Sequence, residues 1–422
     1  MIKDKLAFFG GKKSITFKSP HWIWPPKSKG RIKAINDYYS KESMDEIYFP
    51  KIVKKFEKNF ANYHKKKYAL TFNSGTSSLH ASIFSVGIKE GDEVLVPALT
   101  FHSTATPLFQ FGAIPVVCDC ESDTGNIDPK SIISKISKKT KAIIITHLCG
   151  HPCEMNKILN IAKKNNLHLI EDCSHAHGSK YKGKLVGTFS DISCFSLGNQ
   201  KLLASGEGGI LLTDNKKLFE RALIISDFSQ RIFEQLTFYE NRKFVDTGLG
   251  FKHRIHPVSA AIANYELTKI DYYIKKRNQV LNNFSKKISL IPGISPPVTR
   301  SKMHRGAFFG YRIFFNSKKL NNIDIDLFIK VLSAEGMEVR RASHNPLHLL
   351  NLFSNKAKTF QFLNKKVKLS VNRKSLLLPK SEYFYNTTIS IPTFTFEKKA
   401  LIEQYIKCFK KVCYYLSKNK ID

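Results

Sequence analysis

Short apolar runs alternate with amphipathic stretches along the first half of the chain, and this alternation limits the possible fold more than any other feature. Each apolar run has the length of one buried strand, and the stretches between runs carry apolar residues at helical spacing. Strands joined by helical crossovers form a mostly parallel sheet, whose ligands gather at the carboxyl ends of the strands. The predicted strands are 68–72, 93–97, 114–118, 142–146, 168–171, 192–196 and 209–213, and the predicted helices between them include 77–86, 104–111, 129–136, 155–165 and 218–226.

The pattern changes beyond about residue 260. A long helix is predicted over 258–283, a strand over 308–315 and a final amphipathic helix over 396–416. We therefore expect an α/β fold, in which a large domain with a mostly parallel seven-stranded sheet flanked by helices precedes a smaller C-terminal α+β domain. The expected divisions are an N-terminal arm or helix at 1–45, the large domain at 46–265 and the small domain at 266–422.

The composition suits a protein of the cytoplasm. The 422 residues, 42% of them hydrophobic, are enough for one large core and a smaller one. No apolar run approaches the roughly 20 residues that span a bilayer, and lysines interrupt the first residues, unlike a signal peptide. The eight cysteines are scattered, without the spacing of a disulfide framework. We expect a soluble cytoplasmic protein that has no membrane partner.

The formal net charge of +34 raises the question of a nucleic-acid partner. Lysines recur along nearly the whole length, mostly at the polar positions of amphipathic segments. This distribution favours solvated helix faces, so no nucleic-acid partner is expected, and a polyanion role stays open as the alternative. A basic surface would also attract small anionic substrates, such as sugars that carry a diphosphate.

Lys201 differs from the other lysines in its setting. It follows a short apolar stretch, 192–197, and precedes a glycine-rich turn and a second apolar run, 210–212. A lysine at such a junction can be held partly dry, which lowers the pKa of its amine and makes the free amine a nucleophile towards a carbonyl. Lys201 is therefore a candidate Schiff-base lysine, and the nearby Ser196 is a candidate phosphate contact.

Further candidates lie just after predicted strands. The loop 73–76, which ends in Gly75 and Thr76, places hydroxyls and backbone N–H groups at a helix start, where they could bind an anion or simply cap the helix. Asp172 ends an apolar strand, where its carboxylate could hold a ring nitrogen protonated or cap a loop. His175 and Phe101 could face the same ring or be ordinary packing residues. Together with Lys201, these features indicate a phosphate-bearing aldehyde cofactor.

The order and spacing of these motifs resemble the DegT/StrS family of pyridoxal 5′-phosphate-dependent sugar aminotransferases, within the fold type I class. The resemblance covers the chain from about residue 10 to 415. The matching stretches are 73–76, 91–101, 126–129, 171–178, 206–209 and 346–348.

The resemblance implies pyridoxal 5′-phosphate as the cofactor and a role for each candidate residue. Lys201 would form the imine with the cofactor, Asp172 would pair with the pyridine nitrogen, and Phe101 would stack on the ring. His175 stands where the family usually has a glutamine beside the cofactor's 3′-oxygen. The cofactor phosphate would be held by Gly75, Thr76 and Ser196, and by Arg254 from the other subunit of a homodimer with shared active sites.

The resemblance also implies the reaction. Glutamate or glutamine would donate an amino group, and a keto sugar, expected to be nucleotide-linked, would receive it for surface-polysaccharide or secondary-metabolite synthesis. Lysine at position 201 favours amination, because related dehydratases carry histidine there. The turn 196–201 departs from the Ser-Phe-His-Pro-Thr-Lys form of many sugar-nucleotide members, so a cyclitol or aminodehydroquinate-type substrate stays open. An inactive regulatory or binding homologue is the remaining alternative, against which the retention of Lys201, Asp172 and Thr76 argues.

Four possible metal ligands lie close together after the predicted strand 142–146. They are His147, Cys149, His151 and Cys153. Their spacing is not a standard zinc pattern, and no matching second cluster follows. Packing is the favoured interpretation, and no metal is predicted.

Overall fold

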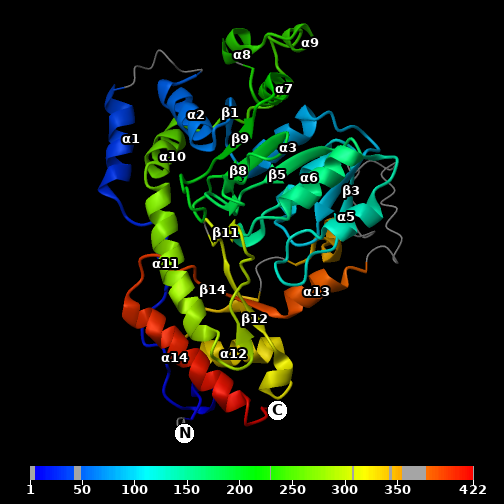
Figure 1. The fold of residues 1–422 in the computed structure, drawn as a ribbon. Helices are drawn as coiled ribbons and strands as arrows, with labels where there is room; N and C mark the ends of the chain where they lie inside the picture. The colour runs from blue at the N-terminus through cyan, green and yellow to red at the C-terminus, as the bar shows by residue number, and fades with distance from the viewer. Residues whose placement is uncertain are drawn as a thin grey trace.

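The computed structural model of the chain describes residues 5–41, 49–228, 230–306, 308–341, 345–353 and 377–421. A large sheet with helices on its faces forms one end of the molecule, and a smaller sheet with α12 (Ile325–Ala334) and α14 (Lys399–Leu416) forms the other (Figure 1). This arrangement confirms the predicted fold class.

The large sheet has seven strands in the order β1-β9-β8-β5-β4-β2-β3. All run parallel except β9, which is antiparallel to both of its neighbours. Five strands have the predicted bounds, while β4 begins earlier and β5 ends one residue later, at Asp172. The strands are β1 (Tyr68–Phe72), β2 (Glu93–Pro97), β3 (Ile114–Cys118), β4 (Thr140–Thr146), β5 (His168–Asp172), β8 (Ile192–Ser196) and β9 (Gly209–Thr213).

Helices cover both faces of this sheet because its strands are buried and apolar on both sides. One face packs against α3 (Gly75–Ser85), α4 (Thr106–Gln110) and α7 (Lys216–Ser226). Towards β2, β4 and β5, the opposite face packs against α5 (Pro129–Lys135) and α6 (Met155–Lys164). Towards β8 and β9, it packs against α2 (Lys51–His64) and α10 (Pro257–Leu267). After α7, the short helices α8 (Gln230–Gln235) and α9 (Tyr239–Arg242) project from the body (Figure 1).

The smaller sheet is antiparallel, in the order β10-β12-β14-β13. The predicted strand 308–315 is shorter than expected, because Phe308 and Gly310 have left-handed φ angles of 43° and 77° that extended strands do not adopt. The strands are β10 (Ile294–Ser295), β12 (Tyr311–Phe315), β13 (Arg340–Arg341) and β14 (Thr388–Ile391), and a separate small sheet contains β6 (Lys180–Tyr181), β7 (Lys184–Leu185) and β11 (Met303–His304).

The long helix predicted over 258–283 is two helices, α10 and α11 (Ile270–Ile288). The N–H groups of Thr268 and Lys269 bond to carbonyls three residues earlier, which tightens the last turn of α10 and ends it. The start of α11 packs in the core around β8, and its end packs in the core of the smaller sheet. Because α11 joins both cores, the division at residue 265 stays a prediction.

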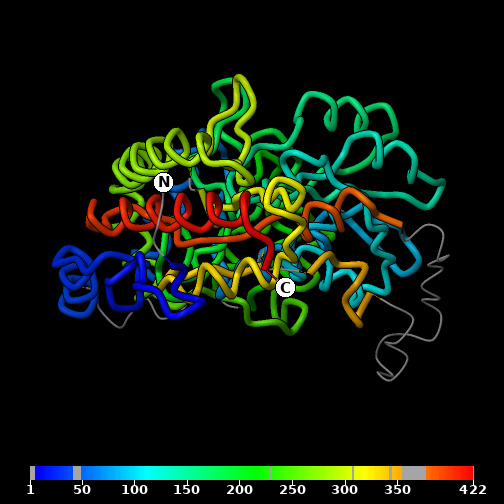
Figure 2. The backbone as a smooth tube through the Cα atoms, turned by 90° about the horizontal axis from the view of Figure 1, so that it is seen from below, coloured from blue at the N-terminus to red at the C-terminus, as the bar shows by residue number. Residues whose placement is uncertain are grey.

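The N-terminal arm is extended only in part. It contains a 3₁₀ turn, Ala7–Phe9, and ends in α1 (Lys29–Lys41). Its first residues are tied to the small domain, since the Ala7 N–H donates to Glu335 at 2.7 Å and the Lys411 amine donates to the Lys12 carbonyl at 2.8 Å. Figure 2 shows α14 between α11 and this arm.

The remaining short elements are α13 (Pro379–Asn386) and the 3₁₀ turns His102–Thr104, Leu148–Gly150, Ser317–Leu320, Leu347–Leu349 and Asn351–Phe353. The predicted helix 104–111 therefore divides into a 3₁₀ turn and α4. None of the helices in the described ranges combines the length and apolar character needed to cross a bilayer.

Candidate active site

Lys201 lies in the loop between β8 and β9, at the carboxyl end of the large sheet. Backbone hydrogen bonds from Leu197 to Gly208 and from Lys201 to Gly198, each 2.8 Å long, close this loop. Burial lowers the pKa of the Lys201 amine to about 8, against the opposing effect of the nearby Asp172 carboxylate. At neutral pH a usable fraction of this amine is therefore uncharged and nucleophilic.

The N-terminal arm reaches the same loop. The indole N–H of Trp24 donates to the Lys201 carbonyl at 2.8 Å. The ring of Trp24 packs edge-on against Tyr273, with ring centroids 5.2 Å apart. This contact holds the backbone of Lys201 from a segment far away in the sequence.

Asp172 ends β5 and is 3% exposed. The Thr104 hydroxyl donates to its Oδ2 at 2.7 Å, and the Ser174 N–H donates to its Oδ1 at 3.0 Å. Thr104 in turn lies 2.6 Å from the Thr100 hydroxyl. The carboxylate is thus held in one orientation, and it is close enough to Lys201 to act on the pKa of its amine.

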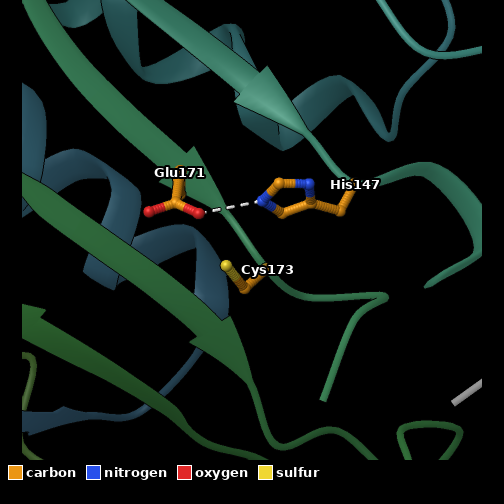
Figure 3. A group of neighbouring side chains, drawn as sticks. All are labelled: His147, Glu171 and Cys173. Atoms are coloured by element: carbon orange, nitrogen blue, oxygen red, sulfur yellow. Dashed lines mark hydrogen bonds and ion pairs between the residues drawn. The ribbon is translucent and has the colours of Figure 1, made fainter. Parts of the chain in front are cut away.

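The neighbouring Glu171 side chain points to the opposite side of β5, where it meets His147 and Cys173 (Figure 3). These side chains are potential metal ligands, but His147 and Glu171 are already engaged in hydrogen bonds within the protein. The Cys153 N–H donates to Nδ1 of His147 at 3.0 Å, so Nε2 carries the proton that is donated to Glu171 at 3.0 Å. Burial raises the pKa of the Cys173 thiol well above its usual range, which disfavours the thiolate that binds metals.

Among the described residues, the four possible metal ligands His147, Cys149, His151 and Cys153 do not bring their ligand atoms together. Both ring nitrogens of His151 are occupied, Nδ1 by the Pro152 carbonyl at 2.7 Å and Nε2 by the Arg300 N–H at 3.2 Å. The Cys153 thiol donates to the Thr146 carbonyl at 3.3 Å. These side chains brace the turn after β4.

The loop predicted to bind a phosphate lies at the start of α3. Ser74 caps the helix by accepting from the Ser77 N–H at 3.1 Å, so the capping interpretation is correct for Ser74. Within the described residues, the backbone N–H groups of Gly75 and Thr76 donate to no acceptor. Unpaired N–H groups in the first turn of a helix favour an anion, so capping and anion binding are compatible here.

Glycine at position 75 brings this loop onto Ser196. A Cβ atom at Gly75 would lie 2.8 Å from Cβ of Ser196, closer than side chains pack. The loop, the end of β8 and the start of β9 therefore form one compact cradle. Its hydroxyls and N–H groups fit the phosphate of pyridoxal phosphate, and Asp172 and Lys201 fit its ring nitrogen and aldehyde.

His175 and Lys201 share an aromatic neighbour from the smaller domain. The ring of Phe309 stacks on His175 with centroids 4.2 Å apart, and Nζ of Lys201 lies 4.0 Å from the centroid of Phe309. A cavity of about 610 Å³ begins beside Phe309, His175 and Gln200. Phe101 is 42% exposed, so it is not a core residue, and its ring centroid lies 4.2 Å from that of His102.

Arg254 lies farther along the same end of the sheet. Its Nε is 3.8 Å from Asp227, and the carbonyl of the preceding His253 accepts from the Asn73 N–H at 2.7 Å. The segment that carries Arg254 therefore contacts the phosphate loop of its own chain. The predicted reach into a second subunit stays a prediction.

Sequence reasoning missed Thr104, Phe309 and Trp24. Thr104 follows a strand end and carries a hydroxyl, which is a weak signal. Phe309 and Trp24 come from segments distant in sequence, and nothing in their local pattern predicts their contact with Lys201.

Comparisons with known proteins identify the family of the chain. The model of the DegT/DnrJ/EryC1/StrS aminotransferase family matches residues 32–400. The chain is 36% identical to GDP-perosamine synthase of Escherichia coli O157:H7 over 270 residues, which cover 63% of this chain and 71% of that protein. It is 28% identical over 354 residues, 83% of each chain, to a putative L-glutamine:3-amino-2,3-dideoxy-scyllo-inosose aminotransferase of Micromonospora echinospora. The aminotransferase structure from Psychrobacter cryohalolentis superposes with a TM-score of 0.81 at 23% identity, covering 93% of this chain and 99% of that one.

Proposed function

Because the chain belongs to the DegT/DnrJ/EryC1/StrS aminotransferase family, we propose that it transfers an amino group from glutamate or glutamine to a nucleotide-linked keto sugar. It is a pyridoxal-phosphate-dependent sugar aminotransferase, of the kind that serves polysaccharide or secondary-metabolite synthesis. The nucleotide carrier is supported by the relative named GDP-perosamine synthase and by the basic surface, which attracts anionic substrates. The donor is supported by the relative whose name includes L-glutamine.

The observation that carries the proposal is the buried Lys201 amine beside Asp172. An amine with a pKa of about 8 can act both as a nucleophile and as a proton carrier near neutral pH. Bound pyridoxal phosphate supplies a carbon that accepts nitrogen and a ring that stores the electron pair left when a proton departs. The side chains around it must then hold that ring and move the protons.

We assign to Asp172 the role of keeping the ring nitrogen protonated. Its carboxylate is oriented by Thr104 and Ser174. Lys201 takes the proton from the α-carbon of the donor and later returns one to the acceptor carbon that receives the nitrogen. Gly75, Thr76 and Ser196 bind the phosphate. His175 faces the 3′-oxygen, and Phe101 covers one face of the ring.

A homodimer belongs to the same proposal, with Arg254 contacting the cofactor phosphate of the second subunit. Exposed aromatic side chains on the projecting segment after α7, including Phe233 and Tyr239, support burial of this region against another surface. A cytoplasmic location is supported by the cysteines, all of which are buried as free thiols.

A cyclitol ketone is the second candidate acceptor. The relative from Micromonospora echinospora is named for a scyllo-inosose substrate, and the turn before Lys201 departs from the form common among sugar-nucleotide enzymes. Both candidates place a ring ketone beside the same lysine.

The test is spectroscopic and then chemical. The purified protein, supplied with pyridoxal phosphate, should develop a visible absorption band that glutamate or glutamine removes. The band should return on addition of a nucleotide-linked keto sugar, and a cyclitol ketone should be ineffective. A protein that binds the cofactor without any response to either donor would contradict the proposed donor class, and return of the band only with the cyclitol would replace the proposed acceptor.

A further inference from the structure

The smaller sheet turns two different faces to its surroundings. On β12 and β14, Tyr311, Ile313, Ile389 and Ile391 lie in the core of the small domain. Residues between them point to the other face because side chains alternate along a strand. There, Arg312 stands opposite Ser390, and Ser390 stands opposite Arg340, in one row across three strands.

Arg312 is buried without a counter-ion. It is 6% exposed, and within the described residues its guanidinium forms neither an ion pair nor a hydrogen bond. The guanidinium lies over the ring of Phe384, whose centroid is 5.9 Å from Cζ. A buried charge without a partner lowers folding stability, so Arg312 destabilises the protein as long as no ligand is bound.

Arg312 lines the cavity of about 610 Å³ that begins at His175, Gln200 and Phe309 beside Lys201. A second donor lies beside this cavity, since the buried indole N–H of Trp22 has no acceptor in the part of the chain that the structure describes.

The charges of the lining are unbalanced. Arg277 has partners of its own, since it donates to the Thr395 hydroxyl at 2.8 Å and lies near the carboxylate of Glu397. Among the described lining residues, Arg312 and Arg340 are then accompanied by one carboxylate, that of Glu338, which already accepts from the His21 N–H at 2.9 Å. The cavity lining therefore has an excess of positive charge. Within the described residues, its Arg312 guanidinium and Trp22 indole N–H have no hydrogen-bond acceptor.

We propose that this cavity binds the carboxylate of the amino donor, and of the 2-oxo acid that the donor becomes, with Arg312 as the guanidinium that receives it. The inference rests on the proposed aminotransferase function. An amino-acid donor carries its carboxylate on the carbon that loses the amine, so the carboxylate must lie beside Lys201. A planar guanidinium binds a carboxylate through two parallel hydrogen bonds, which would also orient that carbon.

The diphosphate of a sugar nucleotide is the other anion that reaches this site. It is attached to a different sugar carbon from the reacting ketone, and the nucleoside beyond it requires an open path to solvent. An arginine that is 6% exposed suits a compact anion better than a group that must continue outwards. The observations therefore favour the donor carboxylate.

The test compares Arg312→Gln with Arg341→Gln. Arg341 lies on β13 of the same sheet, one strand beyond β14, and is ion-paired with Asp326 on the surface, so it provides a matched control. With cofactor-loaded protein, the L-glutamate concentration that half-saturates loss of the visible band should rise by about 10- to 100-fold in R312Q. It should not change in R341Q. An unchanged value in R312Q, in a preparation whose wild type responds to L-glutamate, overturns the inference and leaves the proposed function intact.

A binding measurement tests the anion site at Arg312 even if the proposed aminotransferase function is wrong. Calorimetric titration with 2-oxoglutarate should show binding to the wild type and to R341Q, and a loss of about 10- to 100-fold in affinity in R312Q. If the wild type forms no visible band, the proposed function fails, yet this titration still decides the anion site. A parallel titration with guanosine diphosphate should be unaffected by R312Q. If R312Q weakens the diphosphate and leaves 2-oxoglutarate unchanged, the donor assignment is wrong.

Thermal unfolding of the ligand-free protein distinguishes a binding role from a structural one. Arg312→Met removes an unpaired buried charge and should leave Tm unchanged or raise it. A lower Tm in R312M together with an unchanged L-glutamate response in R312Q would make Arg312 a structural residue and would contradict the proposal.

Discussion

The two carboxylates at the end of β5 are adjacent in the chain, yet they differ in how completely the protein satisfies them. Glu171 accepts five hydrogen bonds. The donors are Nε2 of His147, the N–H groups of Gly187, Phe189 and Ser190, and the hydroxyl of Ser190. Burial alone would raise the pKa of Glu171, but these donors together lower it to about 2. Glu171 therefore fastens the loop 187–190 to the sheet.

Within the described residues, the Asp172 carboxylate accepts two such bonds, and its charge acts on the nearby Lys201 amine. Arg312 lines the cavity beside Lys201 and is buried, and no acceptor for its guanidinium lies among the described residues. Structural and functional charges in this protein therefore differ in how far the chain itself supplies their hydrogen-bond partners. A buried charge whose donors or acceptors are all supplied by the chain holds the fold, and one left incomplete is available to a ligand.

The substitution Glu171→Gln should have the largest effect on stability. The amide replaces an acceptor oxygen with a donor and leaves buried N–H groups unsatisfied, so unfolding free energy should fall by about 3–5 kcal/mol. The pKa of Glu171 is depressed in the folded state, so its stabilising contribution is present above about pH 4.5 and is lost as pH falls towards 2. Denaturant unfolding at several pH values measures both effects. The exposed Glu234→Gln is the control, and equal stability of the two variants would contradict a structural role for Glu171.

Asp172→Asn should show the opposite behaviour. The amide keeps the size and one acceptor oxygen of the side chain but cannot hold a proton on the ring nitrogen. The transamination rate should fall by about 10²–10³-fold, while Tm changes little. Steady-state rates and thermal unfolding of the same preparations check this. The comparison fails if D172N loses stability and keeps its rate.

The pH dependence of cofactor capture probes Lys201 itself. The neutral amine is the reactive form, and burial lowers its pKa to about 8, so the uncharged fraction should rise about tenfold between pH 7 and pH 9 and then level off. Stopped-flow mixing of cofactor-free protein with pyridoxal phosphate follows this rise, with a simple alkyl amine as the reference reaction. A rate that continues to climb to about pH 10.5 would indicate an ordinary solvated lysine.

Thr104→Val should have the smallest effect of the series. It removes the hydroxyl that donates to Asp172 at 2.7 Å and keeps the shape of the side chain. Loss of one such bond corresponds to about 1–1.5 kcal/mol, so the rate should fall by about 5- to 10-fold. Thr100→Val is the matched control. The Thr100 hydroxyl contacts Thr104 and, within the described residues, forms no hydrogen bond with Asp172. Equal effects of the two variants would show that Thr104 has no special part in holding Asp172.

Much of the fold could be predicted because the relevant forces are local. Apolar runs of strand length, separated by helical periods, predicted the seven strands of the large sheet nearly residue by residue. The boundary between α10 and α11 was missed, since it depends on a single tightened turn at Thr268 that leaves the apolar pattern unbroken.

The site was only partly predictable. Asp172 and Lys201 each follow a strand, and the carboxyl ends of parallel strands meet at one edge. Thr104 reaches Asp172 because β2 and β5 both flank β4. Local sequence does not predict the order of strands in a sheet, so this contact could not be predicted. Arg312 could have been noticed in the sequence, because it is a charged residue within the apolar strand β12. The cavity that it lines could not be predicted, because it depends on how distant segments pack together.

Chemical trapping can show whether Lys201 is the residue that bonds to the cofactor. Reduction of the cofactor-loaded protein with borohydride, followed by peptide mass spectrometry, should find the pyridoxyl group on Lys201, and Lys201→Ala should lose both the label and the visible band. The exposed Lys184→Ala should retain both. A label on another lysine, or a K201A protein that keeps its band and its transamination, would contradict the account.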